Sequence, residues 1–294
     1  MSGEIYAVLA ALSYGVAGVA ITRGKARAVG DNGLFLSVLA TAVLTGMIWA
    51  ASGQASMGTL LRSETALPLA TFAAAGLMST VLGRNLMFRA TELTGPVAAS
   101  MLRRLTPVFG LPMAFVILSE LPGQRALGGA VVVLLAVFVY LPPSTSRAGQ
   151  INTLGLWAGI GSAAAYAAAY TLRSHALLSL PDAALGTSIG ALAGVVWILG
   201  RAALQSSSHR RFQALIADRS PWHLVGALSL SAGQLLQFMA LKSAPVVTVA
   251  TLGTLEVFFA ALVLWALSGQ PPVQLARLAF ALALALMGTA LMLA

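Results

Sequence analysis

The chain has 294 residues, of which 59% are hydrophobic and 9% are charged, whereas roughly 25% are charged in an average soluble domain. Only 17 basic and 8 acidic side chains are available to cover a protein of this size, so the composition excludes a water-soluble fold and indicates an integral membrane protein. The formal charge is +9, and the basic residues lie mostly between apolar runs, as they do in cytoplasmic loops of membrane proteins. The absence of cysteine excludes disulfides and thiolate metal sites.

Ten apolar runs, separated by short segments with turn-forming residues, follow one another along the chain. Each run has about the 20 residues that an α-helix needs to cross a bilayer. Strands of a membrane barrel are about half as long and alternate in polarity, so the runs predict helices. No basic leader precedes the first run, so we expect a retained span rather than a signal peptide. The predicted spans are residues 4–22, 33–52, 66–90, 96–118, 124–141, 152–172, 183–203, 222–241, 246–268 and 273–293.

The basic residues of the loops predict the orientation of these spans. Ten Lys and Arg residues follow odd-numbered spans, and four, among them Arg173, follow even-numbered spans. Because cytoplasmic loops are enriched in Lys and Arg, the bias places both termini in the periplasm of a bacterial inner (plasma) membrane.

The two halves of the chain match each other in sequence. At an offset of 149 residues, Pro96 falls on Pro245, and the S-x-x-P turn that begins at Ser119 falls on the one that begins at Ser268. Each half holds five spans, and because five is odd the second half enters the membrane from the opposite side. Such inverted repeats are typical of secondary transporters with a central cavity and alternating access. The predicted halves are residues 1–147 and 148–294.

Residues 83–129 read GRNLMFRATELTGPVAASMLRRLTPVFGLPMAFVILSELPGQRALGG and combine Ala90, a small-residue start to the fourth span, the block LTPVF at 105–109, and Glu120. This pattern resembles the first repeat of the drug/metabolite transporter superfamily, in particular its ten-span EamA-like exporters. The resemblance implies export of amino acids or related small metabolites, often linked to protons, and exporters of aromatic amino acids are among the members.

Residues 240–272 are similar to the second repeat of the same family. The usual Glu-Pro is replaced there by Glu256-Val257, and the terminal Glu is replaced by Gly269. At the offset of 149, Glu256 falls on the position of Pro107.

Ionisable residues inside spans are costly in lipid and therefore indicate function. Arg103 and Arg104 lie about 10–12 Å past Pro96 along a helix, so they are either basic anchors that extend to the cytoplasmic surface or ligands of a substrate. Arg104 shares a helical stripe with Ser100 and Pro107 and is the arginine expected to face the cavity. Because Pro107 cannot donate to the carbonyl of Arg103, it predicts a kink in the fourth span, either as a hinge that frees this carbonyl for the cavity or for packing alone.

Glu256 lies about 16 Å past Pro245, close to the midplane of the membrane. It is either paired with an arginine of the fourth span or available for proton coupling or for a substrate ammonium group. Asn85 and Gln234 occupy equivalent positions in the third and eighth spans, and Gln237 lies one turn further on. These amides are expected to line a shared cavity or to join helices.

Tyr166 and Tyr170 are four residues apart and share a helix face, and Tyr14 lies in the related first span. Their phenolic rings suit an amphipathic ligand or, alternatively, the membrane interface. Glycines spaced by four in the seventh span predict close helix packing. They are Gly186, Gly190 and Gly194.

These features predict an all-α integral membrane transporter with ten helices in two inverted five-helix repeats around a central cavity. It is expected to export neutral or amphipathic amino acids, with Arg104 binding a carboxylate and Glu256 balancing charge or coupling to protons. An exporter of cationic compounds and a non-transporting membrane scaffold are the alternatives. No enzyme motif is present. No cofactor and no nucleic acid is expected; the bilayer and a small-molecule substrate are the expected partners.

Overall fold

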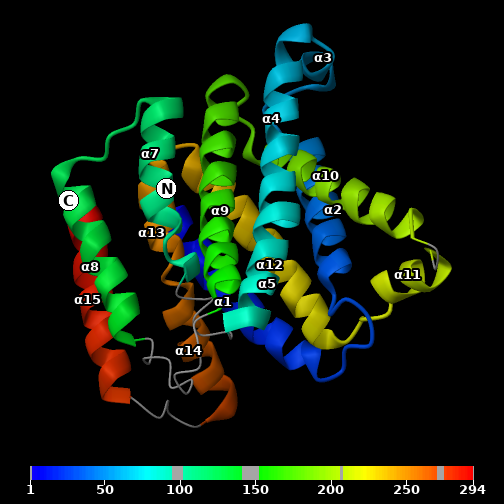
Figure 1. Ribbon diagram of the computed structural model, residues 1–294. Helices are drawn as coiled ribbons and strands as arrows, with labels where there is room; N and C mark the ends of the chain where they lie inside the picture. The colour runs from blue at the N-terminus through cyan, green and yellow to red at the C-terminus, as the bar shows by residue number, and fades with distance from the viewer. Residues whose placement is uncertain (1, 95–101, 141–151, 206–207, 270–274, 294) are drawn as a thin grey trace.

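The computed structural model describes residues 2–94, 102–140, 152–205, 208–269 and 275–293. These residues form helices joined by short connections, and no β-strand occurs within the described ranges (Figure 1). The predicted all-α membrane fold is therefore confirmed.

In the first half, the third predicted span contains a π-helix, labelled η2, between two α-helices. The elements are α1 (Gly3–Lys25), α2 (Leu34–Ser52), α3 (Met57–Leu60), the 3₁₀ helix η1 (Ser63–Thr65), α4 (Ala66–Leu77), η2 (Met78–Gly83), α5 (Arg84–Thr94), α7 (Thr106–Leu118) and α8 (Gln124–Tyr140). Six residues of π-helix are unusual, and such segments are frequent at functional sites.

In the second half, the sixth span is the longest helix and extends past its predicted end at residue 172. The elements are α9 (Thr153–Ser179), α10 (Ala183–Ala203), α11 (Ser208–Leu215), α12 (Pro221–Leu241), α13 (Val246–Gly253), α14 (Glu256–Ser268) and α15 (Leu275–Leu293). α9 ends before Pro181, and the side chain of Asp182 accepts a hydrogen bond from the backbone N–H of Leu185 to cap α10. Arg173 thus lies inside a helix and not in a loop, which corrects the prediction.

Seven helical segments of the described chain are long and apolar enough to cross a membrane. α7 and the Gln124–Val139 part of α8 are shorter apolar helices. α9 has 27 residues, a sufficient length, but a more polar sequence. α1 begins and α15 ends toward the end of the bundle that carries α3 (Figure 1), as an even number of crossings requires. The count of ten spans stays a prediction.

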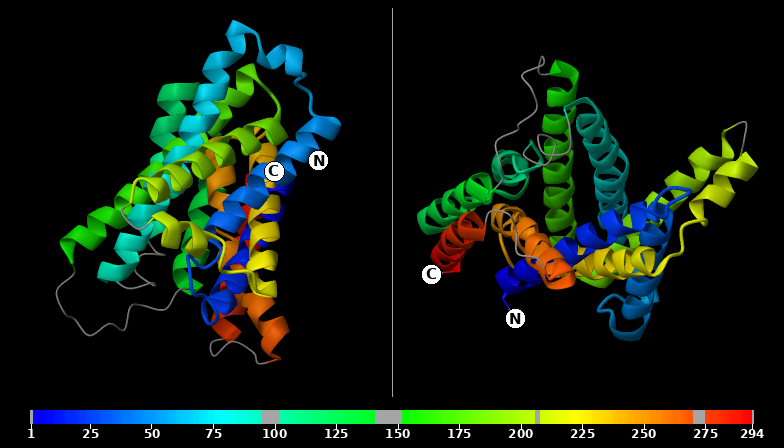
Figure 2. Two further views of the ribbon diagram at one scale, coloured as in Figure 1. Left: turned by 90° about the vertical axis from the view of Figure 1, so that its right-hand side faces the viewer. Right: turned by 90° about the horizontal axis from the view of Figure 1, so that it is seen from below.

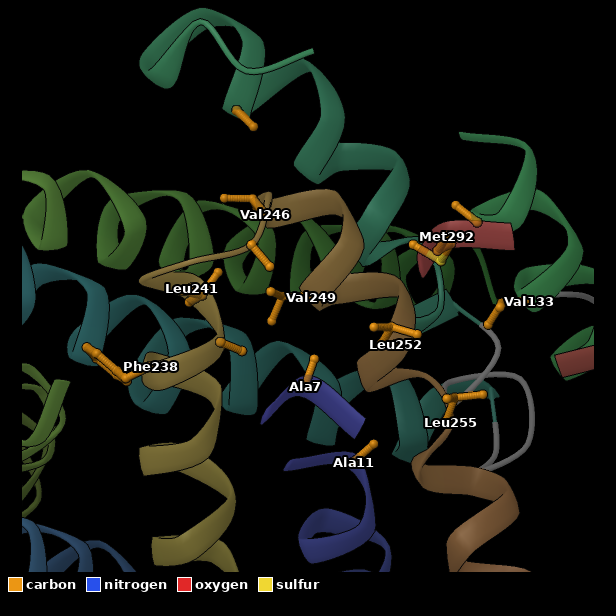
Figure 3. Close-up of a cluster of buried hydrophobic side chains, with 14 of the residues drawn as sticks. Ala7, Ala11, Val133, Phe238, Leu241, Val246, Val249, Leu252, Leu255 and Met292 are labelled. Atoms are coloured by element: carbon orange, nitrogen blue, oxygen red, sulfur yellow. The ribbon is translucent and has the colours of Figure 1, made fainter. Parts of the chain in front are cut away.

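The first helix of each half packs against later helices of the other half. α1 packs against α12 and α14, whereas α9 packs against α4, α5 and α7. α8 and α15 lie side by side at one edge of the bundle, and α11 projects from the opposite edge (Figure 2). The largest buried cluster joins α13 to α1, with Val249 and Leu252 near Ala7 and Ala11 (Figure 3).

Small residues allow α4 and α10 to approach closely. A Cβ atom added to Gly76 would lie 2.2 Å from the carbonyl oxygen of Gly190. Cβ atoms at Gly186 and Gly194 would also contact side chains of neighbouring helices at close range. The predicted packing role of the glycines in this span is confirmed.

Two spans are interrupted in the membrane. Helical residues 102–103 are followed by a turn at Arg104–Leu105 before α7 begins, and α13 is followed by a turn at Thr254–Leu255 before α14 begins. The two helix restarts, at Thr106 and Glu256, are 150 residues apart. When the two helix starts are aligned, Glu256 corresponds to Thr106 and not to Pro107. The offset between the halves is therefore 150 residues at this point, one more than the predicted 149.

The fourth span is interrupted rather than merely kinked, and Pro107 lies in the first turn of α7. Proline is well accepted at this position because the N–H groups of a first helical turn have no partner within the helix. The carbonyl of Arg103, expected to be free for the cavity, accepts a hydrogen bond from Thr106 Oγ1 at 2.7 Å. This part of the prediction was wrong. The division of the chain into two inverted repeats stays a prediction.

Candidate functional site

A cavity of about 140 Å³ lies where the two interrupted spans meet. Such a volume holds roughly five water molecules or a small metabolite of similar size. Its walls come from α1, η2, α5, α9, α12 and the residues around both interruptions. Because α7 and α14 begin and α13 ends at these interruptions, the site offers the fixed dipoles of helix ends as well as side chains.

An ion-paired cluster joins the two interruptions. Arg103 Nη2 pairs with Glu256 Oε1, and Arg104 Nη1 lies 3.2 Å from the same oxygen. Arg104 Nη1 also donates to the carbonyl of Thr254, at the C-terminal end of α13, at 3.3 Å. Glu256 is the first residue of α14, so its negative carboxylate lies at the positive N-terminal end of that helix dipole. The positive guanidinium of Arg104 faces the negative C-terminal end of α13.

Both arginines line the cavity and pair with Glu256, which favours a role in the site over that of basic anchors. The predicted pairing of Glu256 with the fourth span is confirmed, and it involves both arginines. Both arginines line the cavity, but the side chain of Arg103 is 34% exposed and that of Arg104 only 6%. The guanidinium of Arg103 lies 5.9 Å from the ring centre of Tyr166. Arg103 is therefore more accessible to a ligand than Arg104.

Arg173 is a cavity residue that the sequence analysis assigned to a loop. It lies in α9, is 3% exposed, and donates to Gln237 Oε1 at 2.6 Å and to Ser79 Oγ at 2.8 Å. Its guanidinium faces the rings of Tyr170 and Phe238 at 5.8 and 4.9 Å. Its Nε has no partner, and no carboxylate of the described residues forms an ion pair with it. Arg173 is thus a buried cation with neutral partners only.

Arg84 follows the π-helix directly and lines the cavity together with Gln234. The same two residues line a second pocket of about 20 Å³, beside Ser37 and Thr41 of α2. This pocket has room for about one water molecule. Within the described part of the chain, Arg84 forms no ion pair.

Most of the predicted site residues come together in this cavity. Tyr14, Tyr166, Tyr170, Gln234 and Gln237 all line it, and Gln237 Nε2 donates to the hydroxyl of Tyr170 at 2.7 Å. The tyrosines therefore lie in the interior and not at the membrane interface.

Two predicted residues are not part of the described cavity. Asn85 is exposed and does not line it. Ser100 lies outside the described residues. No group of three or more His, Asp and Glu side chains in the described ranges is arranged to hold a metal ion.

Buried carboxylates connect the halves at each end of the bundle, and the sequence analysis did not identify them. Asp218, which precedes α12, accepts hydrogen bonds from the backbone N–H groups of Val29, Gly30 and Asn32 in the α1–α2 loop. Burial alone raises the pKa of Asp218, but these three N–H groups and nearby His223 together hold it below its usual value. At the other end, Asp182 Oδ2 accepts from the backbone N–H groups of residues 54 and 55.

Residues 1–141 match the sequence profile of the EamA-like transporter family. One solved crystal structure is similar over 98% of this chain and 94% of its own chain, with a TM-score of 0.73 and 16% sequence identity, which shows a shared fold. No match is found among the curated proteins.

An all-α membrane fold with a charged internal cavity, together with this match, indicates a membrane transporter of small molecules. The predicted resemblance to the drug/metabolite transporter superfamily is confirmed by this match over residues 1–141.

Proposed function

We propose that the protein is a secondary transporter that exports a small metabolite with a carboxylate and an apolar body. Neutral and amphipathic amino acids, the substrates expected from the sequence, belong to this chemical class. The observation that carries the proposal is the position of Arg103 and Arg173 beside three tyrosines in one internal cavity. A guanidinium group binds a carboxylate through two parallel hydrogen bonds, and tyrosine rings contact an apolar group.

The location of the cavity supports alternating access. Each wall includes an interrupted span, and in transporters such interruptions mark the substrate site between inverted repeats. The carboxylates at the two ends of the bundle connect loops of opposite halves. In the proposed cycle, the halves rock about the cavity and these connections form and break in turn.

Glu256 is proposed to couple transport to protons. While ionised, its carboxylate holds Arg103 and Arg104 together. Protonation removes the charge that both arginines bind and leaves them available for a substrate carboxylate. Both termini are proposed to lie in the periplasm of a bacterial inner membrane, because the bias of basic loop residues persists when Arg173 is left out.

The two alternative functions fit the cavity less well. A cationic drug would meet four arginines and one glutamate among the described lining residues, and like charges at close range repel it. A membrane scaffold requires no buried polar cavity, and burial of unpaired charge in lipid is costly.

A blocked cavity provides the test. Gly253 lines the cavity, and a Cβ atom added there has no atom within 4 Å, so Gly253→Phe fills the site without a backbone clash. Gly200 is exposed near the end of α10 and has the same open surroundings, so Gly200→Phe is the matched control.

The assay is counterflow of radiolabelled amino acids and other small carboxylates in proteoliposomes, with and without a pH gradient. We expect uptake by the wild type and by Gly200→Phe, and uptake at the level of empty liposomes for Gly253→Phe. Absence of counterflow for every carboxylate, or equal rates for both variants, contradicts the proposal.

A further inference from the structure

The cavity carries more positive charge than its own residues neutralise. Its described lining contains four arginines, at positions 84, 103, 104 and 173, and a single carboxylate, that of Glu256. This carboxylate already binds Arg103 and Arg104. Arginine remains protonated in proteins, so the excess of positive charge has to be met by a ligand that the cavity takes up.

Arg173 is the clearest case of an unneutralised charge. It is 97% buried, since 3% of its surface is exposed, and both of its hydrogen-bond acceptors, Gln237 and Ser79, are uncharged. Its Nε is buried without an acceptor. A buried cation that lacks a counter-charge destabilises the protein, and an anion in the adjoining cavity relieves that cost.

We infer that the transported molecule is a small organic anion that lacks an ammonium group. The inference rests on the proposed function and narrows its substrate class. A zwitterionic amino acid brings no net charge, and so leaves the excess of positive charge unchanged. Its ammonium group also needs an acceptor, and the carboxylate of Glu256 is already shared by two guanidinium groups.

The aromatic rings do not replace the missing acceptor. An ammonium group can bind over a tyrosine ring, but Tyr166 faces the guanidinium of Arg103, and Tyr170 faces that of Arg173. A second cation at these rings meets like charge at short range. A carboxylate between these arginines, with an apolar body against the tyrosine rings and Leu230, meets favourable partners on every side.

Compounds with the same apolar body separate the contribution of each charged group. Phenylalanine carries a carboxylate and an ammonium group, 3-phenylpropionate only the carboxylate, and phenethylamine only the ammonium group. Leucine, 4-methylpentanoate and 3-methylbutylamine form the same series with an aliphatic body. Binding of all six to the purified full-length protein in detergent is measured by calorimetry. Binding compares all six compounds directly, without the separate rates at which their uncharged forms cross the bilayer.

We expect the carboxylate of at least one series to bind at least tenfold more tightly than the matching amino acid, and neither amine to bind. Glu256→Gln removes the single described acid of the cavity and is expected to bind that carboxylate at least as tightly as the wild type. Glu64→Gln, at an exposed position, is the control.

An amino acid that binds as tightly as its matching carboxylate, with binding lost in Glu256→Gln, overturns this inference and leaves the proposed function in place. Absence of binding by all six compounds counts against both. If Glu256→Gln does not fold, as judged by its elution from a sizing column, the ranking of the three compounds on the wild-type protein decides alone.

Discussion

Asp218→Asn is expected to weaken the connection between the α1–α2 loop and the start of α12. Asp218 is 2% exposed, and its two oxygens accept from three backbone N–H groups, at 2.8 Å from Val29, 3.1 Å from Gly30 and 2.6 Å from Asn32. Asparagine retains one acceptor oxygen and places an NH₂ group against N–H donors. Charge-assisted hydrogen bonds contribute about 1.5–3 kcal/mol each, so the loss of one such bond predicts a destabilisation of about 2 kcal/mol.

The pH dependence follows from the lowered pKa of Asp218. A carboxylate whose pKa is lower in the folded than in the unfolded protein stabilises the fold above its unfolded pKa of about 3.9, and this stabilisation is lost as the pH falls toward the folded value. The difference in stability between wild type and Asp218→Asn should therefore be constant from about pH 7 to 5 and shrink below about pH 4.

Thermal unfolding in detergent measures this difference. We expect the midpoint of Asp218→Asn to be lower by roughly 4–8 °C at pH 7, and that of the exposed control Glu64→Gln to be unchanged. A midpoint equal to the wild type at pH 7, or a difference that grows as the pH falls, would refute the assignment of Asp218 as an ionised acceptor of the loop N–H groups.

Three further substitutions test the packing and the ion pairs. Arg104→Met leaves Glu256 with one arginine and is expected to lower the free energy of unfolding by about 3 kcal/mol; the cost should be smaller in a Glu256→Gln background, as a double-mutant cycle by denaturant titration would show. Gly76→Leu forces α4 away from α10 and should lower the thermal midpoint by several degrees, whereas Gly18→Leu, with no atom within 4 Å of an added Cβ, should not. Thr106→Val leaves the carbonyl of Arg103 without its hydroxyl partner and should cost about 1 kcal/mol in the same titration; an unchanged value contradicts that role.

The spans could be predicted because lipid imposes a length and a composition on each helix. The depth argument also indicates that Glu256 is paired, protonated or in contact with water in a cavity, since a carboxylate near the midplane cannot extend to the membrane surface. Whether the arginines of the fourth span reach Glu256 could not be derived in the same way. It depends on the interruptions at Arg104–Leu105 and Thr254–Leu255 lying against each other. The second interruption has no proline to signal it.

Two errors in the predicted site have local physical causes. The predicted sixth span ends at residue 172, which places Arg173 in a loop, yet the helix continues to Ser179 and ends before Pro181. The proline was the better indicator of the helix end. Asn85 was expected in the cavity, but its neighbour Arg84 lies there instead. The π-helix that ends at residue 83 has more residues per turn than an α-helix. The residues after it therefore face a different direction from the one that a continuous α-helix would give them.

Counterflow by Arg173 variants tests most directly the claim that the central cavity binds the carboxylate of the substrate. The initial rate is measured for a carboxylate that the wild type transports, and Arg201→Gln, at an exposed position in the last turn of α10, serves as the control. We predict that Arg173→Gln lowers the rate at least tenfold, that Arg173→Lys retains part of it because the charge is kept, and that Arg201→Gln transports at the wild-type rate. A folded Arg173→Gln protein with the wild-type rate and substrate affinity would contradict the account.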